Sequence, residues 1–167
     1  MDVDLGMLLV RLALGPMLVA HGWNKAAGAG GIGGTVRWFE GLGLRPAWLH
    51  ARVAAGTELA AGILVSVGLL TGLGSSAFVG LMAVAALTDH RGKGYFVFKG
   101  GCEYTLLIAT VAVALAAVGP GAWSLDHLLG LNLAGGRWAV VALVAGVGAA
   151  VGLLASSYRP GPKIGGK

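Results

Sequence analysis

The chain has 167 residues, of which 56% are hydrophobic and only 11% are charged. A soluble domain carries about 25% charged residues and must cover a large surface with polar groups. The composition therefore argues against a soluble globular protein, and it excludes a disordered chain. The net charge of +5 does not indicate a nucleic-acid partner, because the basic residues are spread between apolar stretches. The class of protein that remains is an integral membrane protein, which is surrounded by lipid.

Five apolar stretches approach the roughly 17–25 residues that a membrane-spanning helix needs. They lie at about residues 5–21, 53–70, 75–88, 104–118 and 138–155. The turn between the second and third stretches is so short that these two helices must form an antiparallel hairpin. Residues 22–51 mix aromatic and charged side chains, which indicates a cytoplasmic interfacial loop with a short amphipathic or re-entrant segment. We therefore predict an all-α, membrane-embedded helical bundle in a single domain, residues 1–167, that ends in a basic cytoplasmic tail at 156–167.

Lysine and arginine residues are distributed unevenly between the predicted loops. Ten of the twelve lie in the first loop and its flank, the third loop and the tail. These ten are Lys25, Arg37, Arg45, Arg52, Arg91, Lys93, Lys99, Arg159, Lys163 and Lys167. The fourth loop has only Arg137, and Arg11 lies inside the first apolar stretch. Because cytoplasmic loops carry the excess of basic residues, we expect five spans with the N-terminus outside and the C-terminus in the cytoplasm.

A few ionisable residues lie at membrane depth, where they are costly and often functional. An arginine at the centre of a span costs about 2.5–3.5 kcal/mol on insertion scales, so Arg11 should face the bundle and find an acid. The acids within reach of the bundle are Glu58 and Glu103. Histidines end the first and third spans on the cytoplasmic side. The candidate catalytic residues are therefore Arg11, His21, Glu58, His90 and Glu103.

Each of these residues also has a structural interpretation. Arg11 and Glu58 could form a buried ion pair that only fixes the helix register. His21 and His90 could lie at the lipid headgroups. Glu103 could cap the fourth span, since an acid is favourable near a helix N-terminus.

Other residues are expected to have no chemical role. Asp126 falls in the outer loop, where we expect it to be solvated. Cys102 is the only cysteine and is expected to be an inert thiol. Gly148 and Gly152 form a GxxxG pattern that is typical of close helix packing in lipid. No group of His, Cys and carboxylate residues has the spacing of a metal site.

Several short segments share their order and spacing with one known family. They are Arg11–Gly15, His21–Lys25, Trp38–Phe39, Leu42–Pro46, Glu58–Gly62, Gly68–Thr71, His90 with Gly94–Phe96, Gly100–Tyr104 and Gly119–Asp126. Over about residues 5–126 this pattern resembles the DoxX family of integral membrane proteins. The resemblance implies a four-helix core, to which the span at 138–155 would be an addition, and residence in the plasma membrane of a bacterium.

Some members of that family are the membrane subunit of a thiosulfate:quinone oxidoreductase, and one is linked to a membrane oxidoreductase complex. The resemblance thus implies a quinone-linked oxidoreductase or redox-defence subunit, with soluble redox proteins on its cytoplasmic face. Arg11 could then stabilise an anionic oxygen, and His21 or His90 could deliver protons. We expect the quinone-binding residues to be Arg11, His21, Glu58, Glu103 and Tyr104.

Other functions stay open from the sequence. Buried Arg and Glu residues also line the paths of small-molecule or proton-coupled transporters. A non-catalytic membrane scaffold or assembly factor is a third alternative, after the transporter. A homo-oligomer is also compatible with the sequence. Haem ligation by His21 and His90 is a less favoured alternative.

Overall fold

The structure is a computed structural model that describes residues 2–161. Within these residues all regular elements are helical, apart from one isolated bridge between Leu44 and Tyr158. The elements are α1 (Asp2–Ala27), α2 (Gly31–Leu42), α3 (Ala47–Val67), α4 (Thr71–Leu87), the 3-10 helix η1 (Val97–Lys99), α5 (Glu103–Val118), α6 (Leu125–Leu128) and α7 (Gly136–Ser157). The predicted all-α class is confirmed.

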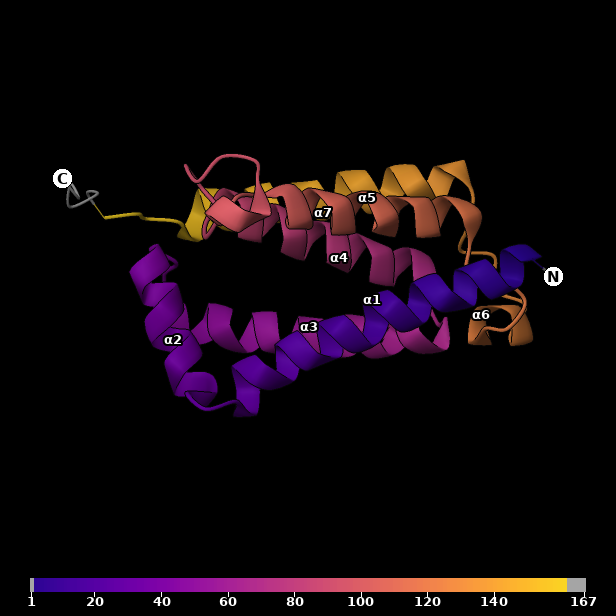
Figure 1. The fold of residues 1–167 in the computed structure, drawn as a ribbon, viewed down its shortest axis with the longest axis horizontal. Coiled ribbons are helices and arrows are strands. Elements are labelled where there is room, and N and C mark those ends of the chain that lie inside the picture. The colour runs from indigo at the N-terminus through magenta and orange to yellow at the C-terminus, as the bar shows by residue number, and fades with distance from the viewer. Residues whose placement is uncertain (1, 162–167) are drawn as a thin grey trace.

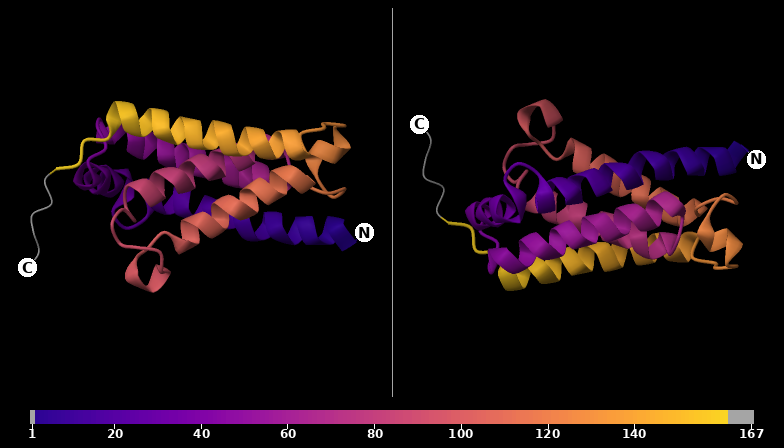
Figure 2. Two further views of the ribbon diagram at one scale, coloured as in Figure 1. Left: turned by 90° about the horizontal axis from the view of Figure 1, so that it is seen from above. Right: turned by 90° about the horizontal axis from the view of Figure 1, so that it is seen from below.

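The five long helices run along the long axis of the molecule in two layers (Figure 1). In one layer α1 packs on α3 and on the shorter α2, and in the other α4 packs on α5 and α7. The turn between α3 and α4 joins the layers. Figure 2 shows that α2 lies at the end where the C-terminus leaves the bundle, and that α6 lies at the opposite end, near the N-terminus. We call these the α2 end and the α6 end.

The five predicted stretches correspond to α1, α3, α4, α5 and α7, and each helix is longer than the stretch predicted for it. Helix α1 continues to Ala27 and α3 begins at Ala47, so the predicted loop at 22–51 is wrong at both of its ends. Hydropathy marks only the apolar part of a helix, whereas backbone hydrogen bonding continues into polar residues. Helix α2 accounts for the predicted short interfacial segment. Residues 162–167 of the predicted tail lie outside the described residues.

Helices α1 and α7 are each long and apolar enough to cross a membrane. Only 22% and 17% of their most apolar windows are buried in the bundle, so most of their apolar surface faces outward. Helices α4 and α5 have 17 and 16 residues, about 25 Å at 1.5 Å per residue. They therefore fall slightly short of a hydrocarbon core of about 30 Å.

The hydrophobic core fills the half of the bundle nearer the α6 end. It consists of Leu14, Leu18, Ala61, Val65, Phe78, Val79, Ile108, Ala112 and Leu115. Helices α1 and α3 approach closely beside it, because a Cβ on Gly62 would lie 2.7 Å from the Gly15 carbonyl oxygen. This half of the interface therefore depends on glycine at both positions.

The GxxxG pattern of α7 does not pack within this bundle, contrary to our expectation. A Cβ on Gly148 or Gly152 would meet no atom of the described residues within 4 Å. The close contact is made by Gly146 instead, where a Cβ would lie 2.7 Å from the Ser76 carbonyl oxygen. The rotation of α7 about its axis, which the pattern alone does not set, decides which glycine faces α4.

The chain after α7 is joined to the loop between α2 and α3. The backbone N–H of Arg45 donates to the Ser157 carbonyl at 2.8 Å, and that of Arg159 donates to the Gly43 carbonyl at 2.7 Å. Gly43 has a φ of 91°, and a Cβ there would clash with Arg159. A small cluster of Phe39, Leu44 and Ala51, with Leu153 and Tyr158 packed against it, closes the α2 end.

Candidate functional site

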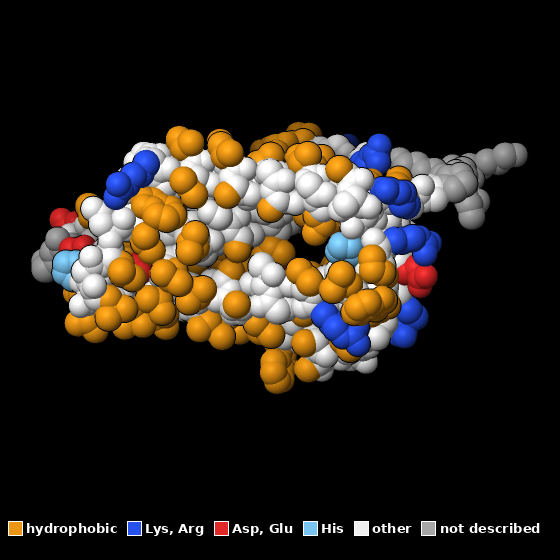
Figure 3. Space-filling model, turned by 180° about the vertical axis from the view of Figure 1, so that it is seen from behind, with side chains coloured by type: hydrophobic (Ala, Val, Ile, Leu, Met, Phe, Trp, Pro, Cys, Tyr) orange, Lys and Arg blue, Asp and Glu red, His pale blue; other side chains and the backbone are white. Residues whose placement is uncertain are grey.

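A cavity of about 670 Å³ lies between the two helical layers, toward the α2 end. Figure 3 shows the hollow from behind, near the end where basic side chains gather. Several wall residues are small and leave space between the helices: Ala54, Ala77, Gly80, Ala145 and Ala149. The polar wall residues are His21, Lys25, His50, Thr57, Glu58, Ser76, Thr88, Asp89, His90, Tyr104 and Thr105. An apolar chamber thus carries several titratable groups.

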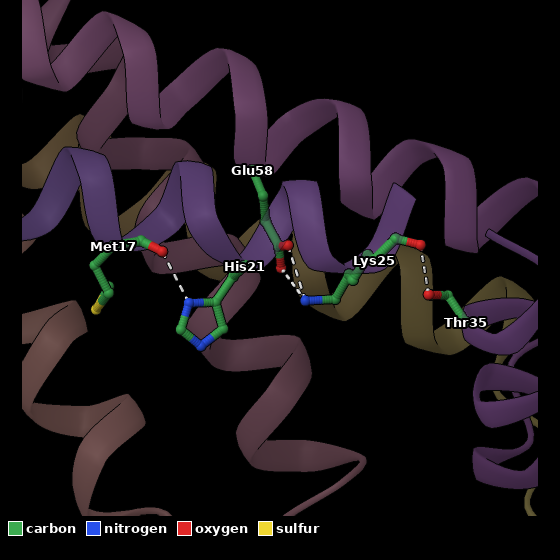
Figure 4. Close-up of polar contacts among 5 residues, drawn as sticks. All are labelled: Met17, His21, Lys25, Thr35 and Glu58. Atoms are coloured by element: carbon green, nitrogen blue, oxygen red, sulfur yellow. Dashed lines mark hydrogen bonds and ion pairs between the residues drawn. The ribbon is translucent and has the colours of Figure 1, made fainter. Parts of the chain in front are cut away.

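An ion pair between α1 and α3 forms part of the wall. The Nζ of Lys25 lies 2.8 Å from both carboxylate oxygens of Glu58, as Figure 4 shows. The two side chains are only 13% and 8% exposed. Thr35 of α2 donates a hydrogen bond to the Lys25 carbonyl at 2.9 Å, which holds α2 against the end of α1. The predicted pairing of Glu58 with Arg11 is wrong, and Lys25 is the partner.

His21 lies one turn before Lys25 on α1, so both side chains point to the same face. Its Nδ1 is 2.8 Å from the carbonyl oxygen of Met17, and its ring lies beside the Lys25–Glu58 pair (Figure 4). Because a carbonyl only accepts, Nδ1 carries the proton, and Nε2 of the neutral imidazole is an acceptor. Nε2 has no hydrogen-bond partner within residues 2–161, and is therefore available to a ligand.

His90 and Tyr104 line the opposite layer of the cavity. His90 lies in the turn after α4, and its Nδ1 is 2.6 Å from the Gly100 carbonyl oxygen. Tyr104 lies in the first turn of α5, where its hydroxyl contacts the sulfur of Met17. These contacts leave Nε2 of His90 as the acceptor nitrogen of the neutral ring.

Glu103 does not line the cavity. Its Oε2 accepts a hydrogen bond from the backbone N–H of Val97 at 2.9 Å. The carboxylate therefore ties the start of η1 to the first residue of α5. This contact is neither the predicted cap of the fourth span nor the predicted role at a ligand.

Arg11 lies outside the cavity as well, deeper toward the α6 end. It is only 1% exposed, and its guanidinium donates to the carbonyl oxygens of Ser66 and Trp123. Asp126 is the acid that interacts with it electrostatically. Arg11 thus satisfies the Ser66 carbonyl near the C-terminal end of α3, where a cation is favourable, and the Trp123 carbonyl in the loop before α6.

Asp126 is buried, so the expectation of a solvated outer-loop acid is wrong. It is 1% exposed, and its carboxylate accepts the backbone N–H of Leu70 at 2.7 Å and of Thr71 at 2.9 Å. Its own N–H donates to the Gly68 carbonyl at 2.8 Å. The acid caps the N-terminus of α4, where a negative charge is stabilising. Arg11 and Asp126 together join α1 and α6 to the α3–α4 turn.

The structure therefore brings together four of the predicted site residues, His21, Glu58, His90 and Tyr104. It places Arg11 and Glu103 elsewhere. Sequence reasoning missed Lys25, which it assigned to a loop, although the spacing of four residues from His21 places both on one face of a continuing helix. Within the part of the chain that the structure describes, no three His, Cys, Asp or Glu residues are grouped as metal ligands.

Comparison with known proteins identifies the family. No curated protein and no solved structure matches the chain. The pattern of the DoxX family matches residues 6–91, which is just over half of the 167 residues. The match covers α1 to α4 and ends at the turn that holds His90, so the resemblance noted between residues 94 and 126 falls outside it. The helical bundle has outward-facing apolar surfaces, and more than half of the chain matches the family pattern. The chain is therefore a multi-pass membrane protein that belongs to the DoxX family.

Proposed function

We propose that the cavity binds a quinone and that the chain is the membrane subunit of a quinone-linked oxidoreductase or redox-defence complex. The observation that carries the proposal is the placement of His21, Lys25 and Glu58 together in the wall of a mostly apolar chamber. Its volume of about 670 Å³ falls in the range of about 300–1,000 Å³ that is usual for small-molecule sites. Apolar walls suit the ring and tail of a quinone, and the polar cluster suits its carbonyl oxygens.

Lys25 is the residue that we expect to contact a ligand oxygen. An ammonium has three N–H donors, and the two oxygens of Glu58 accept two of them. The third donor is left for a ligand. A hydrogen bond from a charged donor is worth about 1.5–3 kcal/mol. Glu58 acts here as a positioning residue, because it holds the Lys25 side chain in place.

The two histidines are suited to hold or move a proton. Each has Nδ1 at a backbone carbonyl, which fixes the ring and leaves Nε2 as the exchanging atom. A bound quinone would supply two-electron, two-proton redox chemistry. His21 comes from α1 and His90 from the turn after α4, so the two rings approach the cavity from both layers.

The distribution of charge supports the proposed orientation. Basic residues gather at the α2 end, as Figure 3 shows, and this end includes the C-terminal side of α7. By the positive-inside rule, we propose that the α2 end faces the cytoplasm of a bacterium, where a soluble redox protein would dock. A phosphatase reporter that is active only outside the cytoplasm should be inactive when fused after Lys167, and activity there would contradict this orientation.

The test is the binding of a decyl-tailed benzoquinone to the purified protein in lipid nanodiscs. Removing a charged donor should weaken binding at least about tenfold in Lys25→Met, since about 1.4 kcal/mol corresponds to tenfold. His21→Ala should also weaken it. Glu103→Gln is the matched control, because Glu103 lies outside the cavity, and its affinity should stay within about twofold. Failure of the unsubstituted protein to bind, or equal binding by Lys25→Met, would overturn the proposal.

A further inference from the structure

We propose that the cavity opens sideways into the bilayer between α3 and α7, and that the apolar tail of the ligand lies in this opening. The inference rests on the proposed function, and it specifies the ligand as a membrane-dissolved molecule with a polar head and an apolar tail. The opening, which we call the α3–α7 window, is bounded by Ala54 and Thr57 of α3 and by Ala145 and Ala149 of α7.

The packing of α7 explains why the window exists. Helix α7 packs along α4 and α5, and it is pressed against α4 where Gly146 meets the Ser76 carbonyl. At the α2 end, Leu153 and Tyr158 join α7 to the cluster that contains Ala51 of α3. From Ala145 to Ala150 the α7 residues that line the cavity are alanine or glycine, which are too small to close the gap. Figure 3 looks onto this side of the molecule and shows the hollow between the layers.

The surroundings of the window are those of a lipid-facing surface. Val53 of α3 is 48% exposed and Val144 of α7 is 65% exposed, and both lie next to the window residues in the chain. In a membrane such side chains contact acyl chains. A molecule dissolved in the bilayer therefore reaches the window without crossing a polar surface.

The polar cluster lines the same cavity as the window residues. Thr57 is followed by Glu58, whose carboxylate binds Lys25 at the inner wall. A head group at Lys25 and His21 would leave its tail pointing back between α3 and α7. A small water-soluble ligand would have no need for this apolar exit, so the window favours a tailed ligand.

A bulky residue in the window should act by steric exclusion. Lipid tails are as apolar as leucine side chains, so a tail gains little attraction on moving from lipid to the window. If the window is closed, the tail has no space to occupy when the head group is bound in the cavity. The effect should therefore appear only for a ligand that has a tail.

The experiment compares one benzoquinone head group, 2,3-dimethoxy-5-methyl-1,4-benzoquinone, with and without a decyl tail. Equilibrium binding is measured in nanodiscs for Ala149→Trp and for the matched control Val151→Trp, which lies on the same helix and is 54% exposed outside the cavity. Ala149→Trp should bind the tailed compound at least about tenfold more weakly and the tailless compound within about twofold. The control should bind both normally.

A second variant, Ala145→Trp, lies one turn away on the same wall and keeps the test decisive if Ala149→Trp does not fold. Normal binding of the tailed compound by the folded window variant would overturn the window and leave the quinone site standing. An equal loss of both compounds would overturn it as well, because the head group would then be affected. Failure of the unsubstituted protein to bind either compound would instead overturn the proposed function, and the window with it.

Discussion

Breaking the Lys25–Glu58 pair one partner at a time should destabilise the protein, whereas removing both partners should not. The pair is bidentate at 2.8 Å, with 13% and 8% of the side chains exposed. Removing one partner of a buried pair costs about 3–5 kcal/mol, while replacing both by apolar residues is often neutral. Because the pair borders a cavity, we place Lys25→Met and Glu58→Met at the lower end, about 3 kcal/mol each, and the double variant within about 1 kcal/mol of the unsubstituted protein.

The measurement is the free energy of unfolding, obtained by titrating SDS into mixed micelles and following helix content by circular dichroism. With these values the double variant should be about 5 kcal/mol more stable than the sum of the two single effects, whereas independent sites add to within about 0.5 kcal/mol. Additive effects would refute the ion pair. The same double variant should remain folded and yet fail to bind the tailed benzoquinone, which separates the structural part of the pair from its proposed role at the ligand.

Two further predictions concern the half of the bundle nearer the α6 end. Arg11→Met removes the donors to the Ser66 and Trp123 carbonyls and the favourable charge near the buried Asp126. It should lower the free energy of unfolding by about 3 kcal/mol. Quinone affinity of the folded protein should stay within about twofold, and a tenfold loss would return Arg11 to the ligand site. Gly62→Ala places a Cβ 2.7 Å from the Gly15 carbonyl oxygen and should lower the free energy of unfolding by about 1–3 kcal/mol in the same SDS titration. The control is Gly56→Ala on the same helix, whose Cβ meets nothing within 4 Å and which should not destabilise the protein. Equal effects of the two variants would contradict the packing of α1 on α3.

Local properties explain why the positions of the long helices are predictable from the sequence. A helix in lipid must satisfy its own backbone hydrogen bonds and must be apolar over its length, and both requirements are visible in a single stretch of residues. The predicted starts and ends of the fourth and fifth stretches lie within two residues of α5 and α7. The first stretch was too short because α1 continues through the polar residues up to Ala27.

That extension changed the interpretation of the site. With Lys25 assigned to a loop, Arg11 is the only cation at membrane depth, and Glu58 and Glu103 are the acids that it could pair with. Once α1 is continuous, Lys25 lies one turn after His21 and reaches Glu58 across the α1–α3 interface. The error in a helix boundary therefore produced the error in the ion pair.

By itself, the sequence determined that the protein belongs in a membrane, that it is all-helical, where its long helices lie and that its basic residues favour one end. These are properties of composition and of short runs, so they do not depend on how distant segments meet. Only the tertiary structure decided which charges meet. Helix rotation and the path of the loops place Arg11 with Asp126 at one end, and His21, Lys25 and Glu58 around a cavity toward the other. Such pairings join residues that are far apart in the chain. Which residues meet is set by helix packing, because glycine and alanine residues let some helices approach closely and leave a gap between others.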